Sequence, residues 1–272
     1  MTDSATFTAS DGTRLAYYTD DFTDPWRAPP TVLLLHAAMG SSRRYFGWVP
    51  HLSRDYRVVR LDLRGHGASQ VPPPDRPLAL DRLVLDVAEL LDHLRVAQAH
   101  VVGNSAGGYL GQQLAMTRPE RVASLCLFGS TPGLKNSQAA GWIPQIGEKG
   151  LRGFLAETIR DRLPADADAG LVSWFLDEAA NNDTAFIGRF VLLMASYDWS
   201  GEVARISCPT LVAIPGAETV GSRANYEPFR ALSDVEFQVY EGMPHNICDA
   251  MPDRCAADVR GFLRRRFPES AA

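Results

Sequence analysis

The chain of 272 residues has little of what builds disulfide frameworks and metal sites, with only four cysteines and six histidines. No two cysteines form a C-x-x-C pair, and their positions are Cys126, Cys208, Cys248 and Cys255. His245 and Asp249 stand near the last two, but their spacing matches no common metal site. We therefore expect reduced thiols and no bound metal or cofactor.

Positive charge and long apolar runs are also scarce. The 27 lysines and arginines are outnumbered by 32 aspartates and glutamates, and the net charge of −5 argues against a nucleic-acid partner. No apolar run approaches the roughly 20 residues of a membrane-spanning helix, and the polar N-terminus lacks a secretory-signal pattern. We expect a cytoplasmic protein with no membrane partner, and the composition is compatible with a homo-oligomer.

What the chain does contain is an alternation of strand-like and helix-like segments. Asp11-Gly12 stands between two alternating segments and predicts a hairpin over residues 5–18. Further strands are expected at residues 31–36, 56–62, 99–102, 122–128, 209–215 and 235–240, and helices at 81–95, 109–116, 222–232 and 252–266. This order predicts an α/β fold with a mostly parallel, eight-stranded sheet flanked by helices.

The alternation breaks between Thr131 and Arg205, where no strand-like run is present. Helices are expected instead, at residues 151–162, 168–180 and 184–197. We therefore divide the chain into a core of residues 1–131 and 206–272 and a helical cap insertion of residues 132–205.

The stretch that carries the most chemical information is Gly103-x-Ser105-x-Gly107. An apolar strand enters it and a helix-patterned segment leaves it, which is the context of a nucleophile elbow. Small residues are needed on both sides of the serine because the turn is tight. The serine is expected in an unfavourable backbone conformation, with its hydroxyl clear of the sheet.

Five motifs in this order resemble the α/β-hydrolase fold family. They are Leu-Leu-Leu-His36 with a small-residue loop, Asp62-x-Arg64-Gly65-His66-Gly67-x-Ser69, the elbow around Ser105, Pro209-Thr-Leu-Val, and Gly242-Met-Pro-His245. The branch that the chain resembles contains small bacterial 3-oxoadipate enol-lactonases, cofactor-free haloperoxidase-like esterases and hydrolases of ring-cleavage products. The resemblance implies a small-molecule substrate and a role in aromatic catabolism.

The resemblance assigns a catalytic triad to the chain. Ser105 matches the nucleophile, and His245 matches the base that this family carries after the last strand. The family acid falls three residues beyond Gly216, at Thr219, which carries no charge. Glu218, one residue earlier, is our candidate for the acid, since the extra methylene of glutamate could compensate for the shift.

Other acids remain open as alternatives at this point. Asp234 and Asp249 lie nearby in the sequence, and a serine–histidine dyad without an acid is a further possibility. The oxyanion hole is assigned to the backbone N–H groups of Ala38 and Ala106, where only the backbone is needed.

Substrate contacts are expected mainly from the insertion, which roofs the pocket in this family. Aromatic and sulfur side chains there are candidates for the cavity wall, and arginines are candidates for holding a substrate carboxylate. The candidates are Trp142, Phe190, Met194, Arg189, Arg43 and Arg44.

These assignments predict a cofactor-independent serine hydrolase that cleaves a small ester, lactone or enol-lactone. Two other enzyme reactions stay open: hydrolysis of a C–C bond in a ring-cleavage product, and cofactor-free dioxygenation. A ligand-binding, receptor-type module that kept the fold is the alternative outside enzymes.

Overall fold

The computed structural model describes residues 4–134 and 139–268. Residues 1–3 and 269–272 of the expected core and 135–138 of the expected cap lie outside the described residues. Within the described part, eight strands form one sheet in the order β1-β2-β4-β3-β5-β6-β7-β8. The strands are β1 (Ala5–Thr8), β2 (Arg14–Asp20), β3 (Thr31–Leu35), β4 (Arg57–Leu61), β5 (Ala99–Asn104), β6 (Val122–Phe128), β7 (Thr210–Pro215) and β8 (Val235–Tyr240).

The sheet is parallel from β4 to β8, and only β1 and β2 run antiparallel to their neighbours. The central strands β3 and β5 are buried along their whole length, as continuous apolar runs require. The predicted mostly parallel, eight-stranded sheet is confirmed. Its parallel strands bring their carboxyl ends to one edge, where a site of this fold class is built.

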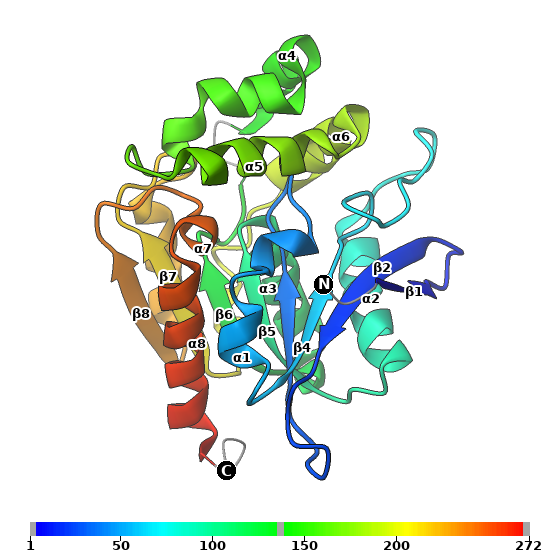
Figure 1. Cartoon of the computed structure of the whole chain (residues 1–272), viewed down its shortest axis with the longest axis vertical. Helices are drawn as coiled ribbons and strands as arrows, with labels where there is room; N and C mark the ends of the chain where they lie inside the picture. The colour runs from blue at the N-terminus through cyan, green and yellow to red at the C-terminus, as the bar shows by residue number, and fades with distance from the viewer. Residues whose placement is uncertain (1–3, 135–138, 269–272) are drawn as a thin grey trace.

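Helices cover both faces of the sheet (Figure 1). On one face lie α1 (Val49–Leu52) and α8 (Pro252–Arg266), and on the other lie α2 (Leu80–His93) and α3 (Ala106–Thr117). Each face has its own cluster of buried apolar side chains. No helix in the described ranges has both the length and the apolar character needed to cross a bilayer.

Three further helices lie above the carboxyl edge of the sheet, at the top of Figure 1. They are α4 (Trp142–Glu157), α5 (Ala169–Ala180) and α6 (Thr184–Ala195). The helix expected at 151–162 is wrong in its bounds, because α4 already begins at Trp142. Pro144 is tolerated in its first turn, and Gly150 (φ 65°, ψ 173°) kinks the helix instead of ending it.

The remaining elements are short. They are α7 (Ile247–Ala250) and the 3₁₀ turns η1 (Ser42–Tyr45), η2 (Pro119–Arg121), η3 (Ala139–Gly141), η4 (Ile159–Asp161), η5 (Val203–Arg205) and η6 (Arg223–Ala231). The expected helix at 222–232 is therefore a 3₁₀ helix, and Pro228 inside it lacks the N–H that an α-helical hydrogen bond would need.

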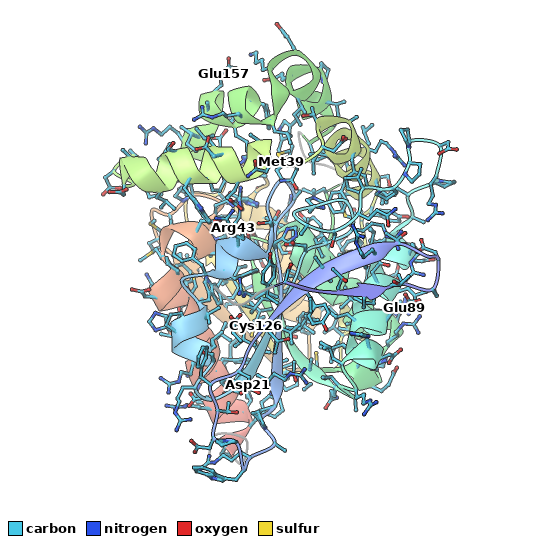
Figure 2. The ribbon with its side chains drawn as sticks, turned by 45° about the vertical axis from the view of Figure 1, so that its right-hand side comes forward. Asp21, Met39, Arg43, Glu89, Cys126 and Glu157 are labelled. Atoms are coloured by element: carbon cyan, nitrogen blue, oxygen red, sulfur yellow. The ribbon has the colours of Figure 1, made fainter. Side chains whose placement is uncertain are left out.

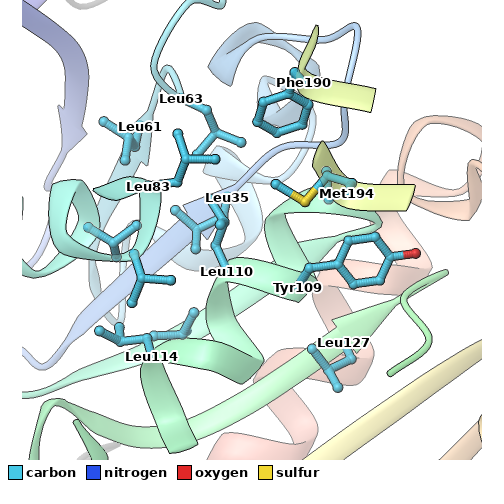
Figure 3. Packing of buried hydrophobic residues seen from close by; sticks show 14 of the residues in the cluster. Leu35, Leu61, Leu63, Leu83, Tyr109, Leu110, Leu114, Leu127, Phe190 and Met194 are labelled. Atoms are coloured by element: carbon cyan, nitrogen blue, oxygen red, sulfur yellow. The ribbon is translucent and has the colours of Figure 1, made fainter. Parts of the chain in front are cut away.

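The three helices above the sheet pack on the core through apolar side chains. Phe190 and Met194 of α6 belong to the same buried cluster as Leu63 and Tyr109 of the core (Figure 3). Figure 2 shows Met39, in the loop after β3, directly below these helices. The carboxyl edge of the sheet is thus roofed by α4, α5 and α6.

Candidate active site

The turn between β5 and α3 holds Ser105 in a strained conformation. Its φ of 50° and ψ of −113° lie in a region that residues with a Cβ rarely adopt. The Ser105 N–H donates to the carbonyl oxygen of Phe128 at 2.9 Å, and the Asn104 side chain donates to the same oxygen at 3.0 Å. Hydrogen bonds to the neighbouring strand therefore hold the strained turn in place.

The two glycines that flank the serine are needed for steric reasons. A Cβ at Gly103 would overlap the backbone of Gly108, on the first turn of α3. A Cβ at Gly107 would overlap the carbonyl oxygen of Leu35 and lie 2.8 Å from that of His36. The tight packing of the elbow against β3 and α3 leaves no room for a side chain.

We expect Gly107→Ala to lower the free energy of unfolding by about 3 kcal/mol, because backbone atoms must move to admit the methyl group. Gly147→Ala is the matched control, since Gly147 lies in α4 with no atom within 4 Å of its ideal Cβ position. That substitution should raise stability by up to about 1 kcal/mol. Urea unfolding followed by circular dichroism measures both, and equal stabilities would contradict the steric argument.

Ser105, His245 and Glu218 form one hydrogen-bonded chain. His245 Nε2 lies 3.1 Å from Ser105 Oγ, and His245 Nδ1 lies 2.8 Å from Glu218 Oε2. An ionised carboxylate only accepts hydrogen bonds, so Nδ1 of the neutral imidazole carries the proton and donates it to Glu218. Nε2 is then the acceptor for the Ser105 hydroxyl, which is the tautomer that a general base needs.

Glu218 is buried and accepts several hydrogen bonds. Its Oε1 accepts the N–H groups of Val220 at 2.9 Å and Gly221 at 3.1 Å, and its Oε2 also accepts the Tyr226 hydroxyl at 3.2 Å. Burial alone would raise the pKa of the carboxyl, but His245 and these N–H donors lower that pKa to about 2. Glu218 is therefore ionised throughout the neutral range and faces His245 with a full charge.

The alternative acids, Asp234 and Asp249, have partners other than His245. Asp234 pairs with Arg266 at 2.7 Å, and Asp249 accepts the Asn246 amide at 3.0 Å and lies 3.7 Å from Arg44. Thr219, at the position where the family acid was expected, donates its hydroxyl to Asp161 at 2.9 Å. The carboxylate in contact with His245 is thus that of Glu218.

Ala38 and Ala106 line the same cavity as Ser105 and His245. Ala106 is the first residue of α3, and the first N–H groups of a helix have no partner within it. In the part of the chain that the structure describes, neither the Ala38 nor the Ala106 N–H donates to a protein acceptor. Two backbone donors are therefore available beside Ser105.

The cavity above Ser105 measures about 50 Å³ and is mostly apolar. Three of the six predicted substrate contacts line it: Arg44, Trp142 and Met194. The prediction is wrong for the other three, Arg43, Arg189 and Phe190, which do not line the cavity. The rest of the wall consists of Ala37, Met39, Leu134, Leu155, Arg162, Phe175, Val191, Val220 and Asn246.

The three incorrect contacts have other partners. Arg43 pairs with Glu178 at 2.9 Å, and Arg189 donates to the carbonyl oxygens of Pro73 and Arg76 at 3.2 and 2.5 Å. Phe190 packs edge-on against His66, with ring centroids 4.8 Å apart. Phe190 precedes Met194 by one helical turn, a rise of about 5 Å, which moves its side chain away from the cavity.

The sequence reasoning missed two contributors. Tyr226 donates to the acid, and Arg162 lines the cavity with a side chain that is almost wholly buried. No pattern in the sequence distinguishes Arg162 from Arg152 and Arg160 of the same segment, which are exposed. A tyrosine in a short 3₁₀ helix likewise carries no signal of its own.

Comparisons with known proteins show which family the chain is similar to. A model of the alpha/beta hydrolase fold family matches residues 30–235. The 3-oxoadipate enol-lactonase 2 of Acinetobacter baylyi is 30% identical over 194 residues, which cover 70% of this chain and 68% of that protein. A solved structure of a hydrolase from Pseudomonas aeruginosa superposes with a TM-score of 0.85 at 29% identity, covering 96% of this chain and 98% of that chain.

One similar protein is much longer than this chain. The dihydrolipoyllysine-residue acetyltransferase component of the acetoin cleaving system of Pseudomonas putida is 35% identical over 148 residues. The match covers 54% of this chain and 36% of that protein, so the chain spans about a third of that relative's length.

Proposed function

Because the chain belongs to the α/β hydrolase fold family, we propose that it is a cofactor-independent serine hydrolase. The substrate is a small carboxylic ester, lactone or enol-lactone, cleaved through an acyl-enzyme. The observation that carries the proposal is the hydrogen-bonded chain from Ser105 Oγ through His245 to Glu218. An activated nucleophile requires this arrangement, in which the base is within reach of the serine and is itself oriented by a third group.

In the first half of the reaction, Ser105 Oγ attacks the substrate carbonyl carbon as its proton passes to His245 Nε2. The negative charge that develops on the carbonyl oxygen accepts hydrogen bonds from the N–H groups of Ala38 and Ala106. Each such donor contributes on the order of 3 kcal/mol in enzymes of this kind. The tetrahedral intermediate then expels the alcohol oxygen, which takes the proton from Nε2.

In the second half, His245 Nε2 takes a proton from a water molecule that attacks the acyl-enzyme. Collapse of the second intermediate returns that proton to Ser105 and releases the acid. Glu218 keeps the imidazole oriented and stabilises its protonated form in both halves.

The size of the cavity supports a small acyl group. Its volume of about 50 Å³ is well below the ~300–1,000 Å³ of typical ligand pockets. A longer substrate would require rotation of wall side chains such as Leu155 and Met194 or displacement of the roof. We therefore propose acetyl to butyryl esters as the model substrates to test first.

The proposal predicts that a small sulfonyl fluoride inactivates the protein by modifying one residue. Methanesulfonyl fluoride should add a single methanesulfonyl group to Ser105 Oγ and release fluoride, in parallel with loss of 4-nitrophenyl acetate hydrolysis. Peptide mass spectrometry locates the group. Modification of the exposed Ser173 instead, or inactivation without modification of Ser105, would contradict the serine mechanism.

Measurements of turnover distinguish the serine hydrolase from the other reactions that the sequence left open. Hydrolysis of a C–C bond would use the same Ser105 and His245 but would leave simple esters nearly untouched, so a ring-cleavage product is the second substrate to test. A ligand-binding module would turn over neither substrate. Dioxygenation would consume oxygen and would not depend on a serine nucleophile.

A further inference from the structure

Arg162 is held close to the base of the triad by the backbone. It follows the 3₁₀ turn η4, and its carbonyl oxygen accepts the Asn246 N–H at 3.0 Å. The preceding residue, Asp161, accepts the His245 N–H at 3.2 Å. These two hydrogen bonds tie η4 to the histidine loop. The position of Arg162 relative to His245 is therefore built into the fold.

Among the described residues, the Arg162 side chain has no anionic partner. It is 6% exposed and lines the cavity of Ser105, yet its guanidinium forms no hydrogen bond and no ion pair with any of those residues. The guanidinium carbon lies 5.1 Å from the centroid of the Trp142 ring, which is a cation–π contact. A guanidinium carries five N–H donors, so several are left to face the cavity.

Two other buried arginines, Arg60 and Arg64, are paired with carboxylates. Arg60 donates to Asp20 at 2.7 Å, and Arg64 donates to Asp86 at 2.6 Å and to Asp11. A buried charge without a partner is costly, and proteins usually satisfy it. Arg162 departs from this rule on the wall of the cavity that holds Ser105, where a ligand can supply the missing anion.

A second arginine, Arg44, borders the same cavity from the side of the core. It stacks on the Phe175 ring, with 3.8 Å from its guanidinium carbon to the ring centroid. Its ion pair with Asp249 is long, at 3.7 Å, and its Nε has no hydrogen-bond partner in the described part of the chain. Its Nη2 donates to the carbonyl oxygens of Met39 at 3.3 Å and Phe175 at 3.4 Å. Arg44 thus adds a second, partly satisfied guanidinium to the wall of the cavity.

Neither nearby carboxylate can serve as the missing partner. Glu218 and Asp161 attract the Arg162 charge from a distance, but both already accept hydrogen bonds from other groups. Burial lowers the pKa of Arg162 to about 10 in spite of them, with Arg44 acting in the same direction. Arg162 is still a cation at neutral pH.

We propose that Arg162, assisted by Arg44, binds a carboxylate of the substrate, so that the preferred substrates are monoesters of short dicarboxylic acids. A guanidinium matches a carboxylate in a planar, two-bond geometry, which fixes the orientation of the acyl chain. This inference rests on the proposed function, because it assigns the ester carbonyl to Ser105. The small cavity favours a four-carbon acid such as succinate, which matches the butyryl limit proposed above.

The test compares monomethyl succinate with methyl butyrate, which has a methyl group in place of the carboxylate. Wild type should show a higher kcat/KM for monomethyl succinate, measured by methanol release. Arg162→Met should lower the ratio of the two kcat/KM values by about 10- to 100-fold, and Arg162→Lys should restore part of it. Arg152→Met, which removes an exposed arginine of the same helical region, should leave the ratio unchanged.

Thermal unfolding provides a measurement that does not depend on turnover. Succinate should raise the Tm of wild type and of Ser105→Ala but not of Arg162→Met. Without ligand, Arg162→Met should melt at or above the wild-type Tm, since it removes an unpaired buried charge, whereas a structural arginine would lower the Tm on removal.

The outcomes separate the two proposals. Ser105-dependent hydrolysis of both esters with a ratio insensitive to Arg162 would overturn the carboxylate site and leave the serine hydrolase standing. Stabilisation by succinate that requires Arg162, without hydrolysis of either methyl ester or of 4-nitrophenyl acetate, would support the carboxylate site and overturn the hydrolase. Absence of both ester hydrolysis and Arg162-dependent stabilisation by succinate would overturn both the serine hydrolase and the carboxylate site.

Discussion

Ser105→Ala is expected to reduce kcat for 4-nitrophenyl acetate hydrolysis by about 10⁵-fold or more, the loss typical of removing a serine nucleophile. No other hydroxyl is hydrogen-bonded to His245 in the described residues, so no second nucleophile can replace it. Activity is measured as release of 4-nitrophenolate, and the residual rate of the variant is compared with the rate in buffer alone.

The control for this variant is Ser173→Ala, which removes an exposed hydroxyl from α5 and should leave the rate unchanged. Alanine and serine both carry a Cβ, so the strained φ of 50° costs about the same for either residue at position 105. We therefore expect Ser105→Ala to keep its fold, with a Tm close to that of wild type. If the folded variant retained more than a small fraction of the activity, the nucleophile would lie elsewhere.

Glu218→Gln should lower kcat by about 10²- to 10⁴-fold while KM changes little. The glutamine amide is nearly the same size, but it removes the charge and can donate to His245 Nδ1. Donation to Nδ1 favours the imidazole tautomer with a proton on Nε2, and that tautomer cannot accept the proton of Ser105. The loss therefore falls on the chemical step.

Glu241→Gln is the matched control for this prediction, since Glu241 is an exposed glutamate in the turn before the histidine loop. It should leave kcat unchanged. Because Glu218 has a pKa of about 2, it stays ionised at every working pH, and protonation of Glu218 cannot explain any change of rate above about pH 4. A loss of less than 10-fold in Glu218→Gln would favour a serine–histidine dyad.

The elements that sequence reasoning predicted well are those controlled by near neighbours. The strand at Thr31–Leu35 is an unbroken apolar run, and such a run is stable only where it is buried on both faces. The elbow was predicted from Gly103, Ser105 and Gly107, because the collisions that exclude larger residues arise within a few positions of the turn or on the adjoining strand.

Predictions were weaker where a helix had to be positioned. Phe190 and Met194 were both candidates for the cavity wall, yet only Met194 lines it. The two lie one turn apart on the same face of α6, so the position of α6 along its own axis, set by its packing on the core, decides which of them meets the cavity. The prediction that Arg43 and Arg189 line the cavity was wrong for a related reason. Each side chain is bound by a protein acceptor outside the cavity wall, Glu178 for Arg43 and the Arg76 carbonyl oxygen for Arg189.

By itself, the sequence predicted the sheet and the position of the strained serine, because these depend on apolar periodicity and local sterics. Its resemblance to the α/β-hydrolase fold family pointed to His245 as the base. Only the tertiary structure decided that Glu218 reaches His245, although Asp234 and Asp249 stood open as alternatives. It also decided that Arg162 is buried without an anionic partner among the residues that the structure describes. Both outcomes depend on which loops meet at the carboxyl edge of the sheet, and such meetings are determined by packing between segments far apart in the chain.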